Sequence, residues 1–251
     1  MNATLVRRIV TIHDVPPHIL VLTAFASYTG QILASLQRWP LWAVVLATLA
    51  PWIPVFAREI VWTYRHYHWL ALFYVLVVTQ TGHFLEHVAQ VVQIHGLGLT
   101  GAQARGVFGA LDIEVVHFVW NTWVVIAVLI LLVPFRRNPW MWPTLAITAW
   151  HAVEHFYIMS VYLSTGVSGT PGLLARGGLI GGGLPLLRPD LHFFYNLVET
   201  LPLIAAFVYQ CAACYRAECG WQRTQTAPAS RRVPDGTATP AMQPIQAEYL
   251  R

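Results

Sequence analysis

The chain has 251 residues, of which 56% are hydrophobic and 10% charged, and it carries a formal net charge of +4 at pH 7. Soluble domains contain about 25% charged residues, so this composition excludes an ordinary soluble protein and predicts an integral membrane protein in contact with a lipid bilayer. Every basic residue is Arg. No soluble segment combines a basic patch with aromatic residues, which argues against a nucleic-acid partner.

Apolar stretches of about 20 residues, each sufficient for one helical membrane crossing, recur along the chain. They predict an all-α integral membrane bundle of six transmembrane helices. In chain order the expected spans are 16–36, 40–61, 69–93, 113–134, 140–164 and 191–211.

The arginines indicate the topology. If the N-terminus is cytoplasmic, the outer loops contain four arginines, and the inner segments contain the other eleven of the fifteen. The positive-inside rule then places both termini in the cytoplasm, and we expect a bacterial plasma-membrane protein. The four outer arginines are Arg38, Arg105, Arg176 and Arg188.

Two copies of one motif divide the chain. His83-x-x-Glu86-His87 in the third span returns as His151-x-x-Glu154-His155 in the fifth, with an offset of 68. Chance matches to such a short pattern are rare enough that two copies call for an explanation.

The spans that follow each motif also correspond. His117 and Asn121 in the fourth span match His192 and Asn196 in the sixth, with an offset of 75. We therefore expect an internal duplication of two-helix units that enter the membrane from the same side as parallel repeats. The expected division is a two-helix scaffold (1–66), a first repeat (67–138), a second repeat (139–216) and a disordered cytoplasmic tail (217–251).

The repeated residues suit a metal centre. Positions i, i+3 and i+4 share one helical face, and imidazole and carboxylate ligands suit iron, zinc or manganese. Ionisable groups at membrane depth are functional candidates by default. The sequence predicts a centre of two ions in the outer half of the membrane, with iron favoured over zinc, manganese or copper. The expected ligands are His83, His87, His117, His151, His155 and His192, with Glu86 and Glu154 as carboxylate ligands that also take part in catalysis.

Other polar residues are expected near this centre. Asn121 and Asn196 would orient the ligands, and Glu114 and Glu199 are further acidic groups that do not correspond between the repeats. Arg105 and Arg176 lie in the two glycine-rich loops, which could close over the site as a lid. Each Arg could bind a carboxylate or phosphate group or be an ordinary solvated loop residue.

The function we expect is redox chemistry of an oxygenase or hydroxylase kind on an apolar or lipidic substrate, with electrons from a donor protein. Three alternatives stay open. Histidines on facing helices could ligate haem b in an electron carrier, the polar face could conduct protons or metal ions at the repeat interface, or the His–Glu network could simply join the helices.

Overall fold

The computed structural model describes Ile12 and residues 15–100, 103–109 and 114–225, with side chains up to Cys214. These residues are helical apart from their connections and a single β-bridge between Gly178 and Gly182. The helices are α2 (Pro17–Leu36), α3 (Leu41–Leu49), α4 (Ile53–Tyr67), α5 (Trp69–Val91), α6 (Glu114–Phe135), α7 (Met141–Thr165) and α8 (Arg188–Gln225), with a 3₁₀ turn at Ala50–Trp52 and a π-helical turn at Val92–Gly96.

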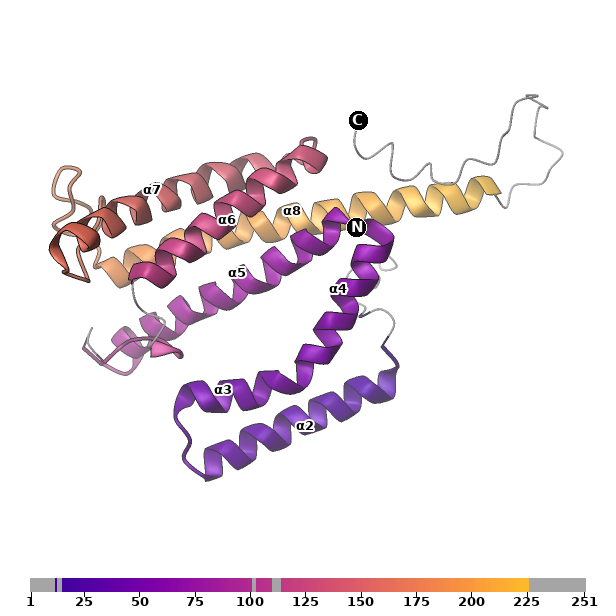
Figure 1. Cartoon of the computed structure of the whole chain (residues 1–251), viewed down its shortest axis with the longest axis horizontal. Helices are drawn as coiled ribbons and strands as arrows, with labels where there is room; N and C mark the ends of the chain where they lie inside the picture. The colour runs from indigo at the N-terminus through magenta and orange to yellow at the C-terminus, as the bar shows by residue number, and fades with distance from the viewer. Residues whose placement is uncertain (1–11, 13–14, 101–102, 110–113, 226–251) are drawn as a thin grey trace.

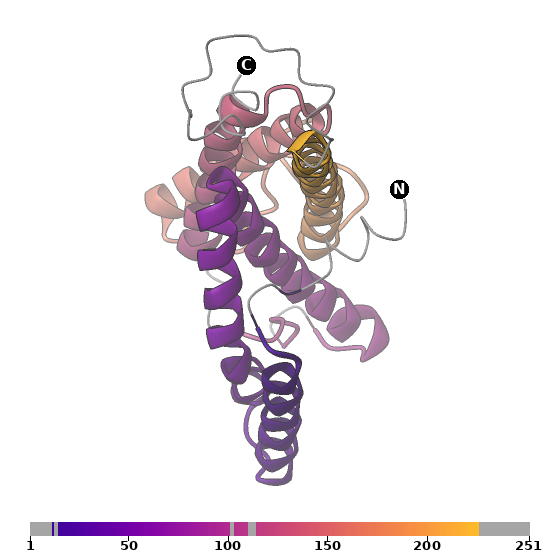
Figure 2. The same ribbon diagram turned by 90° about the vertical axis from the view of Figure 1, so that its right-hand side faces the viewer.

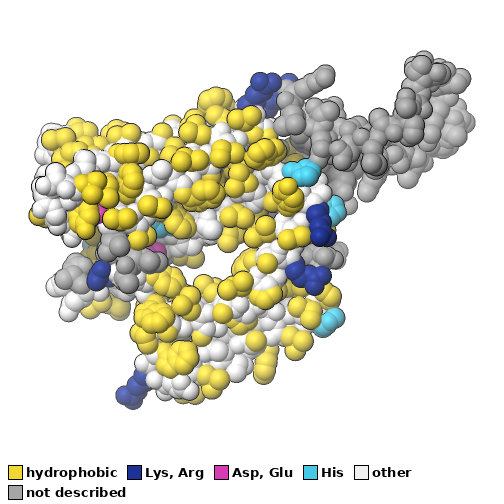
Figure 3. Space-filling view, viewed as in Figure 1, with side chains coloured by type: hydrophobic (Ala, Val, Ile, Leu, Met, Phe, Trp, Pro, Cys, Tyr) yellow, Lys and Arg dark blue, Asp and Glu magenta, His cyan; other side chains and the backbone are white. Residues whose placement is uncertain are grey.

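Helix occupies all six expected spans, and four helical stretches are long and apolar enough to cross a membrane. They are Pro17–Leu36, Leu41–Tyr67, Glu114–Phe135 and Arg188–Cys214. Large apolar side chains cover their outer surfaces (Figure 3), and Val133 on α6 is 77% exposed. Such an exposed apolar surface is expected where a protein meets lipid rather than water.

The second expected span is not one straight helix. Pro51 and Pro54 stand at the first positions of the 3₁₀ turn and of α4, where a missing N–H costs little. The helix therefore bends between α3 and α4 (Figure 1). The α2–α3 hairpin consequently projects away from the other helices, as Figures 1 and 2 both show.

Helix ends follow local chemistry elsewhere. His68 adopts a φ of +39° and separates α4 from α5. Gly166, with a φ of +69°, ends α7 in the left-handed conformation that favours glycine. At the C-terminus, α8 continues to Gln225 and so includes the first residues of the expected tail. Residues 1–11 of the expected scaffold and 226–251 of the tail lie outside the described residues.

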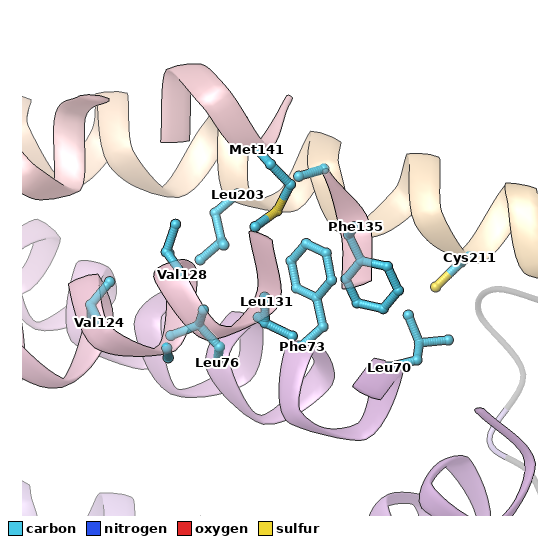
Figure 4. Close-up of a cluster of buried hydrophobic side chains, with 12 residues drawn as sticks. Leu70, Phe73, Leu76, Val124, Val128, Leu131, Phe135, Met141, Leu203 and Cys211 are labelled. Atoms are coloured by element: carbon cyan, nitrogen blue, oxygen red, sulfur yellow. The ribbon is translucent and has the colours of Figure 1, made fainter. Parts of the chain in front are cut away.

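An apolar core joins α5, α6, α7 and α8 at one end of the bundle (Figure 4). Phe73, Leu131, Met141 and Leu203 are fully buried there. The motif histidines lie farther along the same helices from this core, toward the end where the loops after α5 and α7 both lie (Figure 1). The core thus fixes the helices that carry the site.

Candidate metal centre

The structure brings the six predicted histidines together as two groups of three. In each group, one nitrogen of every imidazole lies within 4.8 Å of the corresponding nitrogens of the other two. Two members of each group come from an H-x-x-E-H helix, and the third comes from the next helix along the chain. We call His83, His87 and His117 the first triad and His151, His155 and His192 the second triad.

The spacing of one pair of nitrogens in each triad fits a bound metal ion. The Nε2 atoms of His83 and His87 are 3.4 Å apart, and those of His151 and His155 are 3.2 Å apart. Two ligands of a tetrahedral ion with metal–nitrogen bonds of 2.0–2.1 Å would be separated by about 3.3 Å. The same separation also allows one imidazole to donate a hydrogen bond to the other.

The two triads adjoin each other across the bundle. The ring centroids of His117 and His155 are 5.7 Å apart, and those of His87 and His192 are 6.1 Å apart. The second triad is deeply buried, with His151, His155 and His192 at 0%, 1% and 4% exposure, whereas His83 of the first triad is only partly buried. The six imidazoles therefore form one continuous cluster with two unequal halves.

Neighbouring groups orient the second triad. The Nδ1 atom of His151 lies 2.7 Å from Oε2 of Glu199, and Nδ1–H of His192 donates to the carbonyl oxygen of Arg188 at 3.0 Å. The buried Nε2 atom of His192 has no hydrogen-bond partner among the described residues. A buried nitrogen without a hydrogen-bond partner is costly. Metal-binding imidazoles usually donate their other N–H to a carboxylate or carbonyl. The surroundings of His151 and His192 therefore suit histidines that bind a metal ion.

Glu86 and Glu154 belong to neither triad. The backbone N–H of Phe108 donates to Oε1 of Glu86 at 2.8 Å, and that of Leu173 donates to Oε1 of Glu154, also at 2.8 Å. The reason is angular: at 3.6 residues per turn, the two histidines of a motif lie about 40° apart, while the glutamate points about 60° to the other side of the first histidine. In the structure, both of these expected carboxylates hold the loop that follows their helix through one oxygen.

Asn121 and Asn196 are buried and correspond in position. Each Nδ2 donates to the backbone carbonyl of the triad histidine four residues earlier, His117 or His192, at 2.9 Å. Asn196 also accepts a hydrogen bond through Oδ1 from Nε2 of Gln80 at 3.1 Å. Both residues therefore brace the helices that carry the triads and do not touch the imidazole rings through these bonds.

Gln80 is a site residue that the sequence reasoning missed. Its side chain is fully buried, and besides bonding Asn196 it accepts a hydrogen bond from Nε1–H of Trp120 at 2.9 Å. Trp120 in turn stacks on His83, with ring centroids 5.0 Å apart. The sequence did contain a signal for this residue, because Gln80 is a polar residue one turn before the motif in an otherwise apolar helix.

Glu114 lies in an ion pair at the edge of the cluster. Nη1 of Arg188 donates to Oε1 of Glu114 at 2.7 Å, and the second nitrogen of the same guanidinium bonds the other carboxylate oxygen. The backbone N–H of Gly169 also donates to Oε1 of Glu114 at 2.8 Å. Glu114 thus joins α6, α8 and the loop after α7. Arg188, which the sequence assigned to an outer loop, is its ion-pair partner, a role that this assignment did not suggest.

The two loop arginines are not equivalent. Arg176 is exposed and donates to the carbonyl oxygen of Pro185 within its own loop at 3.3 Å. Arg105 is also exposed, but it borders a cavity of ≈ 380 Å³ that reaches all three histidines of the first triad. The walls of this cavity come from α3, α5, α6 and the loop around Gly106.

The chain matches no protein-family model and no curated protein sequence, and it matches no solved structure. No relative therefore supplies a function. The inference rests on the two triads, their hydrogen-bonded neighbours and the cavity.

Proposed function

We propose that the protein is an integral membrane metalloprotein that binds two transition-metal ions, one on each histidine triad, and carries out redox chemistry on an apolar or lipidic substrate. The observation that carries this proposal is the convergence of six mostly buried imidazoles, in two sets of three, inside an apolar helical bundle. Helices can be joined with far fewer ionisable groups, each of which is costly at membrane depth.

The proposal includes six membrane spans. Besides the four apolar helices, α5 and α7 contain 23 and 25 residues, which gives them lengths of about 34 and 37 Å at 1.5 Å per residue. Their polar residues lower the mean hydropathy, but His87, His151 and His155 face the interior of the bundle. We propose that both helices cross the membrane among the others, with both termini in the cytoplasm.

An internal duplication accounts for matched geometry in the two halves. The loop hydrogen bonds of Glu86 and Glu154 are equal in length, as are those of Asn121 and Asn196. The ring centroids of Trp120 and His83 are 5.0 Å apart, and those of Tyr195 and His151 are 5.1 Å apart. These pairs follow the sequence offsets of 68 and 75, which supports parallel repeats related by a pseudo-twofold axis.

The donor set limits the metal. Three neutral imidazoles suit zinc, copper or iron and leave coordination positions open. Redox chemistry selects iron or copper among these, and we keep iron as the first candidate, with an external protein as electron donor. In this proposal Glu86 and Glu154 anchor the loops, and Glu199 and Asn196 support the second triad.

Elemental analysis of detergent-purified protein tests the proposal. We expect two metal ions per chain, falling to one in His83→Ala and to one in His151→Ala, since each substitution removes a ligand from one triad only. His66→Ala, at an exposed histidine on α4, should retain both ions. Less than about half an ion per chain in the unmodified protein, with no loss in either triad variant, would refute metal binding.

The same preparation separates the haem alternative. Haem gives an intense Soret band, and its appearance would replace the dinuclear proposal with an electron carrier. Substrate-driven ion flux into proteoliposomes would likewise favour the transporter alternative.

A further inference from the structure

The first triad borders a cavity that can admit a ligand, whereas the histidines of the second triad are deeply buried. All three histidines of the first triad line the ≈ 380 Å³ cavity, and no histidine of the second triad does. This volume lies at the small end of the range of about 300–1,000 Å³ that ligand pockets occupy. If the two halves arose by duplication, something in the sequence must have closed the second one.

One difference between the halves that bears on the cavity lies at Gly82 and Trp150, equivalent positions that immediately precede His83 and His151. A Cβ atom placed on Gly82 would meet no heavy atom within 4 Å, and Gly82 borders the cavity. In the second half, the Trp150 ring packs beside Ala175, Leu191 and Tyr195, and its Nε1–H donates to the Tyr195 hydroxyl at 3.1 Å. An indole side chain therefore fills the second half where the first is empty.

The cavity walls indicate the kind of molecule that enters. Val45 and Leu49 on α3 line the cavity together with the first triad, and Leu85, Val107 and Phe108 are among the other lining residues. Figure 3 shows the molecule hollowed between the α2–α3 hairpin and the rest of the bundle, with apolar side chains on both sides of the hollow. Walls of this kind admit a hydrocarbon chain from the surrounding lipid and offer water few partners.

Charge at the cavity indicates the head group. The exposed Arg105 borders the cavity, and its planar guanidinium matches a carboxylate or phosphate. A metal dication held by the three neutral histidines of the first triad also favours an anion nearby. The second triad instead has Glu199 beside His151, whereas Val124 occupies the position equivalent to Glu199 in the first half.

We infer that the cavity at the first triad is the substrate site and binds an aliphatic chain with an acidic head group, with Gly82 keeping it open and Arg105 receiving the head. The second triad is closed by Trp150 and takes no substrate. The assignment of the first triad as the reacting centre rests on the proposed function, but binding of the chain can be measured without it.

Equilibrium binding of tritiated decanoic acid to the purified protein in lipid nanodiscs tests this inference. We expect saturable binding of one molecule per chain. Gly82→Leu and Gly82→Trp should each weaken it by about tenfold or more, because their side chains occupy the cavity. Val153→Trp, which introduces the same indole side chain at an exposed position on α7, should bind decanoate as the unmodified protein does.

The head group is tested separately. Arg105→Gln should weaken the binding of decanoate and leave that of tritiated decanol unchanged, whereas Arg176→Gln should affect neither. Decyl phosphate competing as well as decanoate would assign the site to phosphorylated lipids, within the same acidic class.

Three results would overturn the inference: no saturable decanoate binding, unchanged affinity in both Gly82 variants, or equal loss in Val153→Trp. Metal content is measured on every sample. If the protein binds decanoate but no metal, the inferred binding site is supported and the proposed function is refuted. If it binds two metal ions but no decanoate, the proposed function is supported and the inferred binding site is refuted.

Discussion

The side chain that most sharply distinguishes the two triads is Glu199. Its Oε2 atom lies 2.7 Å from Nδ1 of His151, and both side chains are almost completely buried. The carboxylate fixes the ring orientation of His151 and directs its Nε2 atom toward His155. The first triad has no carboxylate at the equivalent position, because Val124 stands there.

Replacing Glu199 by Gln should therefore weaken only one of the two proposed metal sites, the one at the second triad. Loss of a carboxylate that orients a ligating histidine typically costs about 10–100-fold in metal affinity, so a metal titration of Glu199→Gln should become biphasic. The first triad in the same molecule is the control. Equal weakening of both sites, or of neither, would contradict this role of Glu199.

At the scale of elements, the two motif helices hold the loops that follow them. Gly106 and Gly172 have φ values of +71° and +73°, and a Cβ atom on either would overlap Oε1 of the motif glutamate, Glu86 or Glu154. Each loop therefore approaches its helix through a glycine. A backbone N–H close to that glycine, of Phe108 in the first loop and of Leu173 in the second, donates to the motif glutamate. This pairing explains why an acid stands at the third position after the first histidine of each motif.

Gly106→Ala and Gly172→Ala should each release one loop. A left-handed conformation costs a non-glycine residue about 1–2 kcal/mol, and the overlap with the glutamate adds to this. We expect faster amide hydrogen exchange in residues 103–109 for the first variant and in 169–178 for the second, each without change in the other loop.

Gly109→Ala is the matched control for these loop variants. Its φ is not in the left-handed region, and its nearest contact would be an ordinary one of 3.4 Å, to Cβ of Arg105. Exchange as fast in Gly109→Ala as in Gly106→Ala would show that the Glu86 contact does not hold the loop.

At the scale of the whole molecule, the ion pair between Arg188 and Glu114 joins the two proposed repeats. Glu114 begins α6, Arg188 begins α8, and their side chains are 4% and 20% exposed. The pair also receives the N–H of Gly169 from the loop after α7. It thus closes the loop end of the bundle, opposite the apolar core around Phe73 and Leu131.

Arg188→Gln should lower the stability of the folded bundle by up to about 3 kcal/mol, because it leaves the buried carboxylate of Glu114 without its cation. The measurement is the thermal unfolding midpoint in detergent. Adding Glu114→Gln should recover part of the loss, since the double variant has no unpaired buried charge. Arg176→Gln, at an exposed loop position, should leave the midpoint unchanged; a fall as large as that of Arg188→Gln would refute the specific role of the pair.

The sequence by itself determined the helical membrane character, the approximate positions of the helices and the identity of the six histidines that meet. Composition determines the helical membrane character, because a chain this apolar lies in lipid and must satisfy its backbone hydrogen bonds within helices there. Helical periodicity sets the last, because positions i and i+4 of each motif share a face.

Only the tertiary structure decided what surrounds these histidines. The direction of Glu86 and Glu154 depends on which loop backbone reaches them, and the pairing of Glu199 with His151 and of Arg188 with Glu114 depends on contacts between helices distant in sequence. The cavity beside Gly82 and the filled space at Trp150 depend on how α3 and the loops pack. Such contacts arise from three-dimensional packing of many side chains at once, which one-dimensional spacing does not encode.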